Sequence, residues 1–157
     1  MRRKDREIRD PEELRRVLET GDACRIALVD DGEPYVVTMN YGLVWDYDDT
    51  PILYFHCANE GRKLDIIRKK ADACCVVDVD HELTGGSSAC SWGMKFASVV
   101  GRGKMEFVQD PEERVRALDA IMRHYTDRSF DGYDERVFAA TEILRLRLVE
   151  LTGKRRT

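Results

Sequence analysis

Short, apolar and partly β-branched segments separated by turn residues constrain the fold of this 157-residue chain more than any other feature. Segments of this kind, joined by hairpin turns, are typical of antiparallel sheets. The last segment alternates leucine with arginine or valine, as expected of a strand that buries one face. We predict six strands, at residues 23–29, 34–41, 52–57, 73–79, 96–108 and 143–151.

Two similar motifs mark helix starts. Asp10 and Asp110 are each followed by Pro-Glu-Glu, which joins an N-cap acceptor to a proline in the first helical position. A third, shorter helix is predicted at residues 60–70, where Leu64 and Ile67 share one face. We expect a flexible loop at residues 84–92, and loose order around 129–133 and in the C-terminal tail.

These elements predict a single, mainly β domain over residues 1–157. Six mostly antiparallel strands with peripheral helices favour a small β-barrel, because closure removes exposed sheet edges. A doubly wound parallel sheet is disfavoured. The helices do not alternate regularly with the strands, and no glycine-rich phosphate loop follows the first strand.

Composition and charge exclude several classes of protein. Hydrophobic residues make up 43% of the chain and charged residues 36%, which is typical of a folded protein. The net charge of -4 and the scattered cations argue against nucleic acid as a partner. No apolar run approaches the roughly 20 residues of a membrane span, and no secretory apolar core follows the basic start, so we expect a cytoplasmic protein without membrane contact. The five cysteines include no Cys-x-x-Cys pair and are interpreted as free thiols, mostly buried, and thiol chemistry is the lesser alternative.

Residues 54–65 contain the closest grouping of candidate functional side chains in the sequence. A strand delivers His56, a turn with Gly61 follows, and Arg62 and Lys63 open the next helix. Backbone N–H groups at a helix start favour an anion, and the two cations make this a candidate phosphate site. The cations could instead belong to a solvated basic helix face. A metal site is not expected, because His56 and its strand neighbour Cys57 point to opposite faces.

Four segments form an ordered set of motifs, at residues 1–8, 34–42, 56–65 and 98–103. Together they resemble the nitroimidazole-resistance branch of the FMN-binding split barrels, which are similar to pyridoxamine 5'-phosphate oxidase. The resemblance extends to about the end of the strand at 96–108. It implies a six-stranded antiparallel split barrel and a homodimer, with FMN bound at two sites along the subunit interface.

The resemblance also implies roles for individual residues. Lys63, with help from Arg62 and Ser98, would hold the flavin phosphate. His56 resembles a histidine near the flavin and would act as a catalytic proton donor. Four consecutive strand residues would border the isoalloxazine ring, their backbone groups bonding its polar edge: Val37, Thr38, Met39 and Asn40.

Each of these roles has a structural alternative. Val37 and Met39 could be core residues of an ordinary strand, with Thr38 and Asn40 facing out. Ser98 could be an ordinary strand serine, Arg62 a surface residue and His56 a structural histidine. Trp92 could cover the flavin or substrate pocket, or it could be a hydrophobic plug in a dimer core.

The function that the resemblance implies is that of an FMN-dependent oxidoreductase or flavin reductase. It would take electrons from NAD(P)H or another donor and pass them to a small electrophile, such as a nitroimidazole or another nitro-aromatic compound. A shared fold does not fix the substrate. A non-enzymatic flavin- or haem-binding module stays open. So does an enzyme like pyridoxamine 5'-phosphate oxidase, although the sequence has no evident extra set of arginines for a second phosphate.

Overall fold

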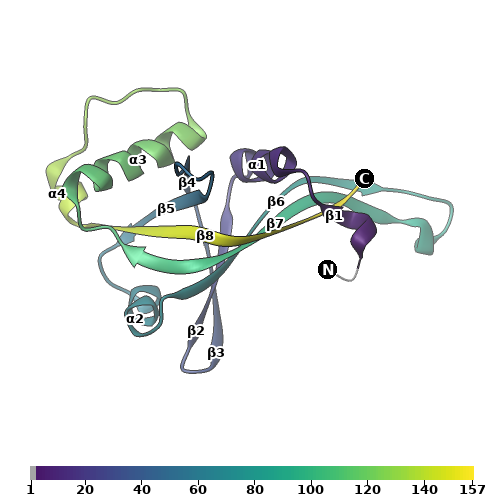
Figure 1. Ribbon diagram of the computed structural model, residues 1–157, viewed down its shortest axis with the longest axis horizontal. Coiled ribbons are helices and arrows are strands. Elements are labelled where there is room, and N and C mark those ends of the chain that lie inside the picture. Colours follow the sequence, from purple (N-terminus) through teal and green to yellow (C-terminus); the bar gives the residue numbers. More distant parts are fainter. Residues whose placement is uncertain (1–2) are drawn as a thin grey trace.

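The structure, a computed structural model, describes residues 3–157 as one eight-stranded sheet with helices around it (Figure 1). Met1 and Arg2, which begin the first resemblance motif, lie outside the described residues. The strands are β1 (Glu7–Ile8), β2 (Cys24–Asp30), β3 (Glu33–Met39), β4 (Gly42–Trp45), β5 (Pro51–Ala58), β6 (Asp72–Thr84), β7 (Gly93–Phe107) and β8 (Thr141–Arg156). The α-helices are α1 (Pro11–Thr20), α2 (Arg62–Lys69), α3 (Pro111–Tyr125) and α4 (Glu135–Ala139), and 3-10 turns occupy Lys4–Arg6 and Ala89–Ser91.

The sheet is antiparallel throughout and follows the order β3-β2-β6-β7-β8-β5-β4, with β1 paired to the end of β8. Its two edge strands, β3 and β4, are separated in the sequence by only Asn40 and Tyr41. The sheet therefore curls until its edges meet at this corner, which gives a barrel left open along one side. The predicted mainly β, antiparallel barrel is confirmed.

The predicted count of six strands is wrong, because β1 and β4 were missed. Both are too short to give an alternation signal. Strand β1 forms by pairing with Lys154 and Gly153 at the far end of the chain. Strand β4 lies so close to α3 that a Cβ on Gly42 would collide with the backbone of Ala120 and Ile121.

The prediction of a loosely ordered C-terminal tail is also wrong, because β8 continues through Arg156. Residues 152–156 are mostly polar and carry no apolar pattern. They are held by backbone pairing to β7, and at Gly153 and Lys154 to β1 as well. Strand β6 likewise runs on to Thr84, and the short helix α4 follows the irregular residues 129–133.

Both aspartate helix starts are confirmed. The Asp10 carboxylate accepts a hydrogen bond from the Glu12 N–H at 3.1 Å, and the Asp110 carboxylate accepts one from the Glu113 N–H at 2.8 Å. Helices α1 and α2 contribute to the main core on the inner face of the sheet. Helix α3 packs on β4 and β5 and buries a second, smaller cluster around Tyr54.

Much of the outer sheet face is left uncovered by the helices. Val36 on β3 is 62% exposed and Val149 on β8 is 70% exposed. Beyond this face, β6 and β7 project as a two-stranded hairpin past the body of the protein (Figure 1). In residues 3–157, no helix has the length and apolar character to cross a membrane.

Candidate functional site

The start of α2 is built to present backbone donors. Gly61, at the N-cap, has a φ of +128°, a conformation that glycine adopts without strain. Its carbonyl accepts hydrogen bonds from the Leu64 N–H at 2.9 Å and the Asp65 N–H at 3.3 Å. No side chain caps this helix, and the N–H groups of Arg62 and Lys63 have no acceptor in the described part of the chain. They are therefore available to an anion.

The two cations at this helix start differ in their surroundings. Arg62 bonds Asp30 through Nε at 2.9 Å, and its guanidinium lies 5.1 Å from the centre of the Tyr35 ring. Lys63 is half-buried and forms no ion pair within residues 3–157. Its ammonium contacts the Cys57 thiol, whose pKa is raised by burial, with Lys63 acting in the opposite direction. Lys63 is thus the available cation, whereas Arg62 ties α2 to the β2–β3 turn.

The predicted flavin-bordering residues lie at the sheet edge. Within residues 3–157, β3 pairs only with β2, so backbone groups along its other side are open to a ligand. Val37 and Met39 pack against the core, while Thr38 and Asn40 are exposed. The Asn40 amide donates to the Asp22 carbonyl at 3.3 Å. The side chains lie as expected of an ordinary strand, with Val37 and Met39 towards the core. The open backbone edge of β3 is compatible with the predicted contact to the flavin ring.

Ser98 is not brought near Lys63 within one chain. Its hydroxyl donates to the Lys154 carbonyl at 3.3 Å, near the end of β8. Cys57, which Lys63 contacts, lies opposite Glu142 near the start of the same strand. The twelve positions from Glu142 to Lys154 correspond to about 40 Å along a strand. A phosphate site that uses both residues would need Ser98 from a second subunit.

The side chains of His56 and Trp92 are also not grouped with Lys63. His56 is exposed on β5 opposite Ile143, and its side chain points to the face opposite that of Cys57. Trp92 lies in the β6–β7 connection and is 53% exposed, with its ring beside Gly85. Within residues 3–157, no three His, Cys, Asp or Glu side chains are grouped as metal ligands.

All five cysteines are free. Cys24 and Cys75 are both fully buried, and the neighbouring Cys75 thiol together with burial raises the pKa of Cys24. Cys90 is exposed in the β6–β7 connection. The thiols are free as predicted, but only Cys24 and Cys75 are buried, while Cys57 and Cys74 are half-buried.

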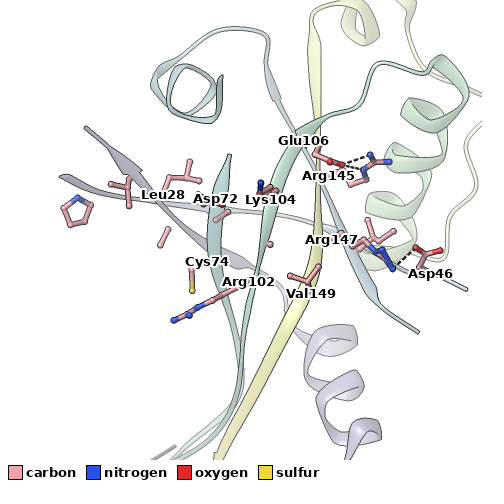
Figure 2. A pocket seen from close by; sticks show the side chains of 16 residues that line it. Leu28, Asp46, Asp72, Cys74, Arg102, Lys104, Glu106, Arg145, Arg147 and Val149 are labelled. Atoms are coloured by element: carbon pink, nitrogen blue, oxygen red, sulfur yellow. Dashed lines mark hydrogen bonds and ion pairs between the residues drawn. The ribbon is translucent and has the colours of Figure 1, made fainter. Parts of the chain in front are cut away.

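A groove of about 1000 Å³ on the outer sheet face was missed by sequence reasoning (Figure 2). None of the eight predicted site residues lines it. Apolar residues of β2, β3, β5 and β8 form much of its wall, and four cations project from alternate positions of β7 and β8: Arg102, Lys104, Arg145 and Arg147. The charged residues at alternate positions of β7 and β8 were the sequence feature that could have indicated this groove. The pairing of β7 with β8, which brings the cations together, was not visible in the sequence.

Two of these cations are neutralised within the groove. Arg145 bonds Glu106 at 2.6 Å, and the Arg147 guanidinium lies 3.3 Å from the Asp46 carboxylate, as the dashed lines in Figure 2 mark. Among the described residues, Arg102 has one ion pair, with Glu150 at 3.9 Å. Lys104 forms no ion pair with any of residues 3–157.

Comparison with known proteins gives one family. A family model described as pyridoxamine 5'-phosphate oxidase matches residues 10–155. Among solved structures, a candidate 5-nitroimidazole antibiotic resistance protein from Bacteroides thetaiotaomicron is 34% identical, with a TM-score of 0.80 and coverage of 94% of this chain and 85% of that one. None of the curated proteins matches the chain.

Two further structures share the fold at lower identity. The flavocytochrome Anf3 from Azotobacter vinelandii is 21% identical, with a TM-score of 0.82 over 100% of this chain and 72% of that one. An FAD and heme binding protein from Mycobacterium smegmatis is 22% identical, with a TM-score of 0.83 over 96% and 73%. The split-barrel class predicted from the sequence is therefore confirmed.

Proposed function

Because the chain belongs to the pyridoxamine 5'-phosphate oxidase family, we propose that it binds FMN and acts as an FMN-dependent oxidoreductase on a small electrophile. Family membership agrees with the motif resemblance, which implies FMN. Electron transfer is the chemistry that a bound flavin supplies, and the chain's own residues would bind and orient it. Nitroimidazoles or other nitro-aromatic compounds are the proposed substrates, with NAD(P)H as the proposed donor.

The observation that carries this proposal is the start of α2. A half-buried Lys63 without an ion pair in residues 3–157 lies beside backbone N–H groups that have no acceptor there. A phosphate dianion would satisfy both, because charge-assisted hydrogen bonds from fixed donors are the strong ones. The open edge of β3 offers backbone donors and acceptors suited to the polar rim of a flavin ring.

A homodimer is part of the proposal. Ser98 can join Lys63 at a phosphate only if it comes from the other subunit, given their separation in one chain. Ser98 follows the projecting β6–β7 hairpin, on which three large apolar side chains are exposed: Leu83, Trp92 and Met94. Exposed apolar side chains grouped on a hairpin mark a contact surface. The single-domain organisation and the cytoplasmic location stay predictions.

The visible spectrum of the purified protein, followed by extraction and chromatography of its chromophore, tests the proposal. We expect flavin absorption and release of FMN. Release of FAD or haem would favour the alternative cofactors. A colourless protein that does not bind added FMN would contradict the proposal. Turnover of NAD(P)H with a nitro-aromatic acceptor separates an enzyme from a flavin- or haem-binding module. Sedimentation equilibrium tests the dimer.

A further inference from the structure

The start of α2 offers one available cation to a flavin phosphate. Arg62 is tied to Asp30 at 2.9 Å, which leaves Lys63. A phosphate monoester carries a charge of about −1.5 to −2 at pH 7. One lysine and the neutral backbone N–H groups match only part of this charge. A second cation is therefore expected from elsewhere, because charge-assisted hydrogen bonds are the strong ones at a phosphate.

Lys154 is the cation that accompanies Ser98. The two residues lie directly opposite each other in the β7–β8 ladder. Side chains in this position share one face of the sheet, with Cβ atoms about 4.5–5.5 Å apart. The Ser98 hydroxyl donates to the Lys154 carbonyl at 3.3 Å, which is longer than the usual O–H···O distance of about 2.5–3.0 Å. The hydroxyl is therefore weakly engaged and can rotate towards a ligand.

The ammonium group of Lys154 is available as well. It lies 5.6 Å from the centre of the Phe96 ring and forms no ion pair in the described part of the chain. Glu7, which lies opposite Lys154 on β1, bonds Arg9 at 2.9 Å instead. A lysine carries three donors on a flexible four-carbon stem, so this ammonium can reach an anion bound at the Ser98 hydroxyl.

The acidic side chain on the other side of Ser98 is also engaged. Asp78 lies opposite Ser98 on β6. Its carboxylate lies 2.9 Å from Nε2 of His81 and pairs with Arg25. These two contacts occupy the carboxylate, so Asp78 does not cancel the charge of Lys154.

The outer sheet face joins the two halves of the site in a dimer. The groove on this face lies midway along β8, between the end that pairs with Cys57 and the end that pairs with Ser98. A two-fold contact that brings Ser98 of one subunit to Lys63 of the other covers the groove, since such an interface uses the same patch on both subunits. Burial of the exposed Val36 and Val149 favours this contact.

We propose that Lys154 of the partner subunit is the second cation of the flavin phosphate site. Each site then combines Lys63 and the α2 backbone N–H groups of one subunit with Ser98 and Lys154 of the other. The inference rests on the proposed FMN function and on the proposed dimer. FMN binding and dimerisation are coupled in this arrangement, because each phosphate is bonded to both subunits.

Lys154→Met should weaken FMN binding about tenfold or more, because it removes a charge-assisted contact to the phosphate. Riboflavin, which has the same ring without the phosphate, should bind this variant and the wild type equally. Lys154→Arg keeps the charge and should retain FMN affinity. Lys95→Met, which removes a lysine that pairs with Glu82 at 3.1 Å on the β6–β7 hairpin, is the matched control. Quenching of flavin fluorescence on titration gives each dissociation constant.

Mixed dimers test whether Lys154 acts across the interface. Co-expression of Lys63→Ala and Lys154→Met chains with different affinity tags allows purification of the dimer that contains one of each. If Lys154 acts on the partner's site, one of the two sites in this dimer has both lysines, and FMN should bind there with wild-type affinity. Impaired binding at both sites would mean that Lys154 acts within its own chain, which contradicts the proposal.

Two further results would overturn the inference. An FMN dissociation constant in Lys154→Met equal to that of the wild type would remove Lys154 from the site. Equal losses of FMN and riboflavin affinity would assign it a role away from the phosphate. Both results leave the proposed FMN function intact. A wild-type protein that does not bind FMN would contradict the proposed function itself, so the two failures are distinguishable.

Discussion

The backbone N–H of Tyr41 donates a hydrogen bond to the hydroxyl of Tyr125 at 3.0 Å, across 84 residues of the chain. The same hydroxyl donates to the Asp22 carbonyl at 2.9 Å, and Nε2 of the neighbouring His124 lies 2.7 Å from the Gly21 carbonyl. The end of α3 thus ties the α1–β2 connection to the corner where β3 passes into β4. Polar contacts, in addition to core packing, fix the open side of the barrel.

Tyr125→Phe should lower the free energy of unfolding by about 1–2 kcal/mol, because it leaves the Tyr41 N–H without its acceptor. Urea unfolding followed by circular dichroism measures the change. Tyr47→Phe is the control, since Tyr47 is 95% exposed and its hydroxyl makes no hydrogen bond within residues 3–157. Equal stability of the two variants would show that the corner does not depend on this contact.

Lys63→Ala should weaken FMN binding by about tenfold to a hundredfold, because it removes the available cation at the start of α2. The thermal stability of the apoprotein should change little. Quenching of FMN fluorescence on titration gives the dissociation constant. Lys69→Ala, on the same helix but paired with Asp31 at 3.1 Å, is the matched control. An unchanged FMN dissociation constant would remove Lys63 from the phosphate site.

His56→Ala should retain flavin but reduce the electrophile more slowly, if the exposed imidazole supplies a proton to the substrate. Steady-state turnover with a nitro-aromatic acceptor measures the effect. His81→Ala removes another exposed histidine, one that bonds Asp78 at 2.9 Å, and should leave turnover unchanged. Undiminished turnover in His56→Ala would make His56 a structural residue.

Stability should fall at alkaline pH partly through Tyr54. Burial, together with a 2.9 Å hydrogen bond to Glu113, raises the pKa of Tyr54 from 10.0 to about 12. Since the raised pKa belongs to the folded state, its contribution is complete below about pH 10 and is lost as pH rises to about 12. In urea unfolding over this interval, Tyr54→Phe should lose stability less steeply than the wild type. Parallel pH profiles would contradict the prediction.

The sequence by itself determined the features whose causes are local. The Asp-Pro-Glu-Glu motifs specify helix starts because capping involves neighbouring residues only. Alternation along residues 143–151 specifies a strand with one buried face, because successive side chains point to opposite sides. The ordered motifs were enough to identify the family.

Only the tertiary structure decided which distant residues meet. Strand β1 and the polar end of β8 exist because backbone pairing, which carries no apolar pattern, joins the two ends of the chain. The same pairing separates Ser98 from Lys63 and sets Lys104 opposite Arg147. Strand register depends on contacts between segments far apart in the sequence. For this reason the helix starts and the barrel could be predicted, whereas the groove could not.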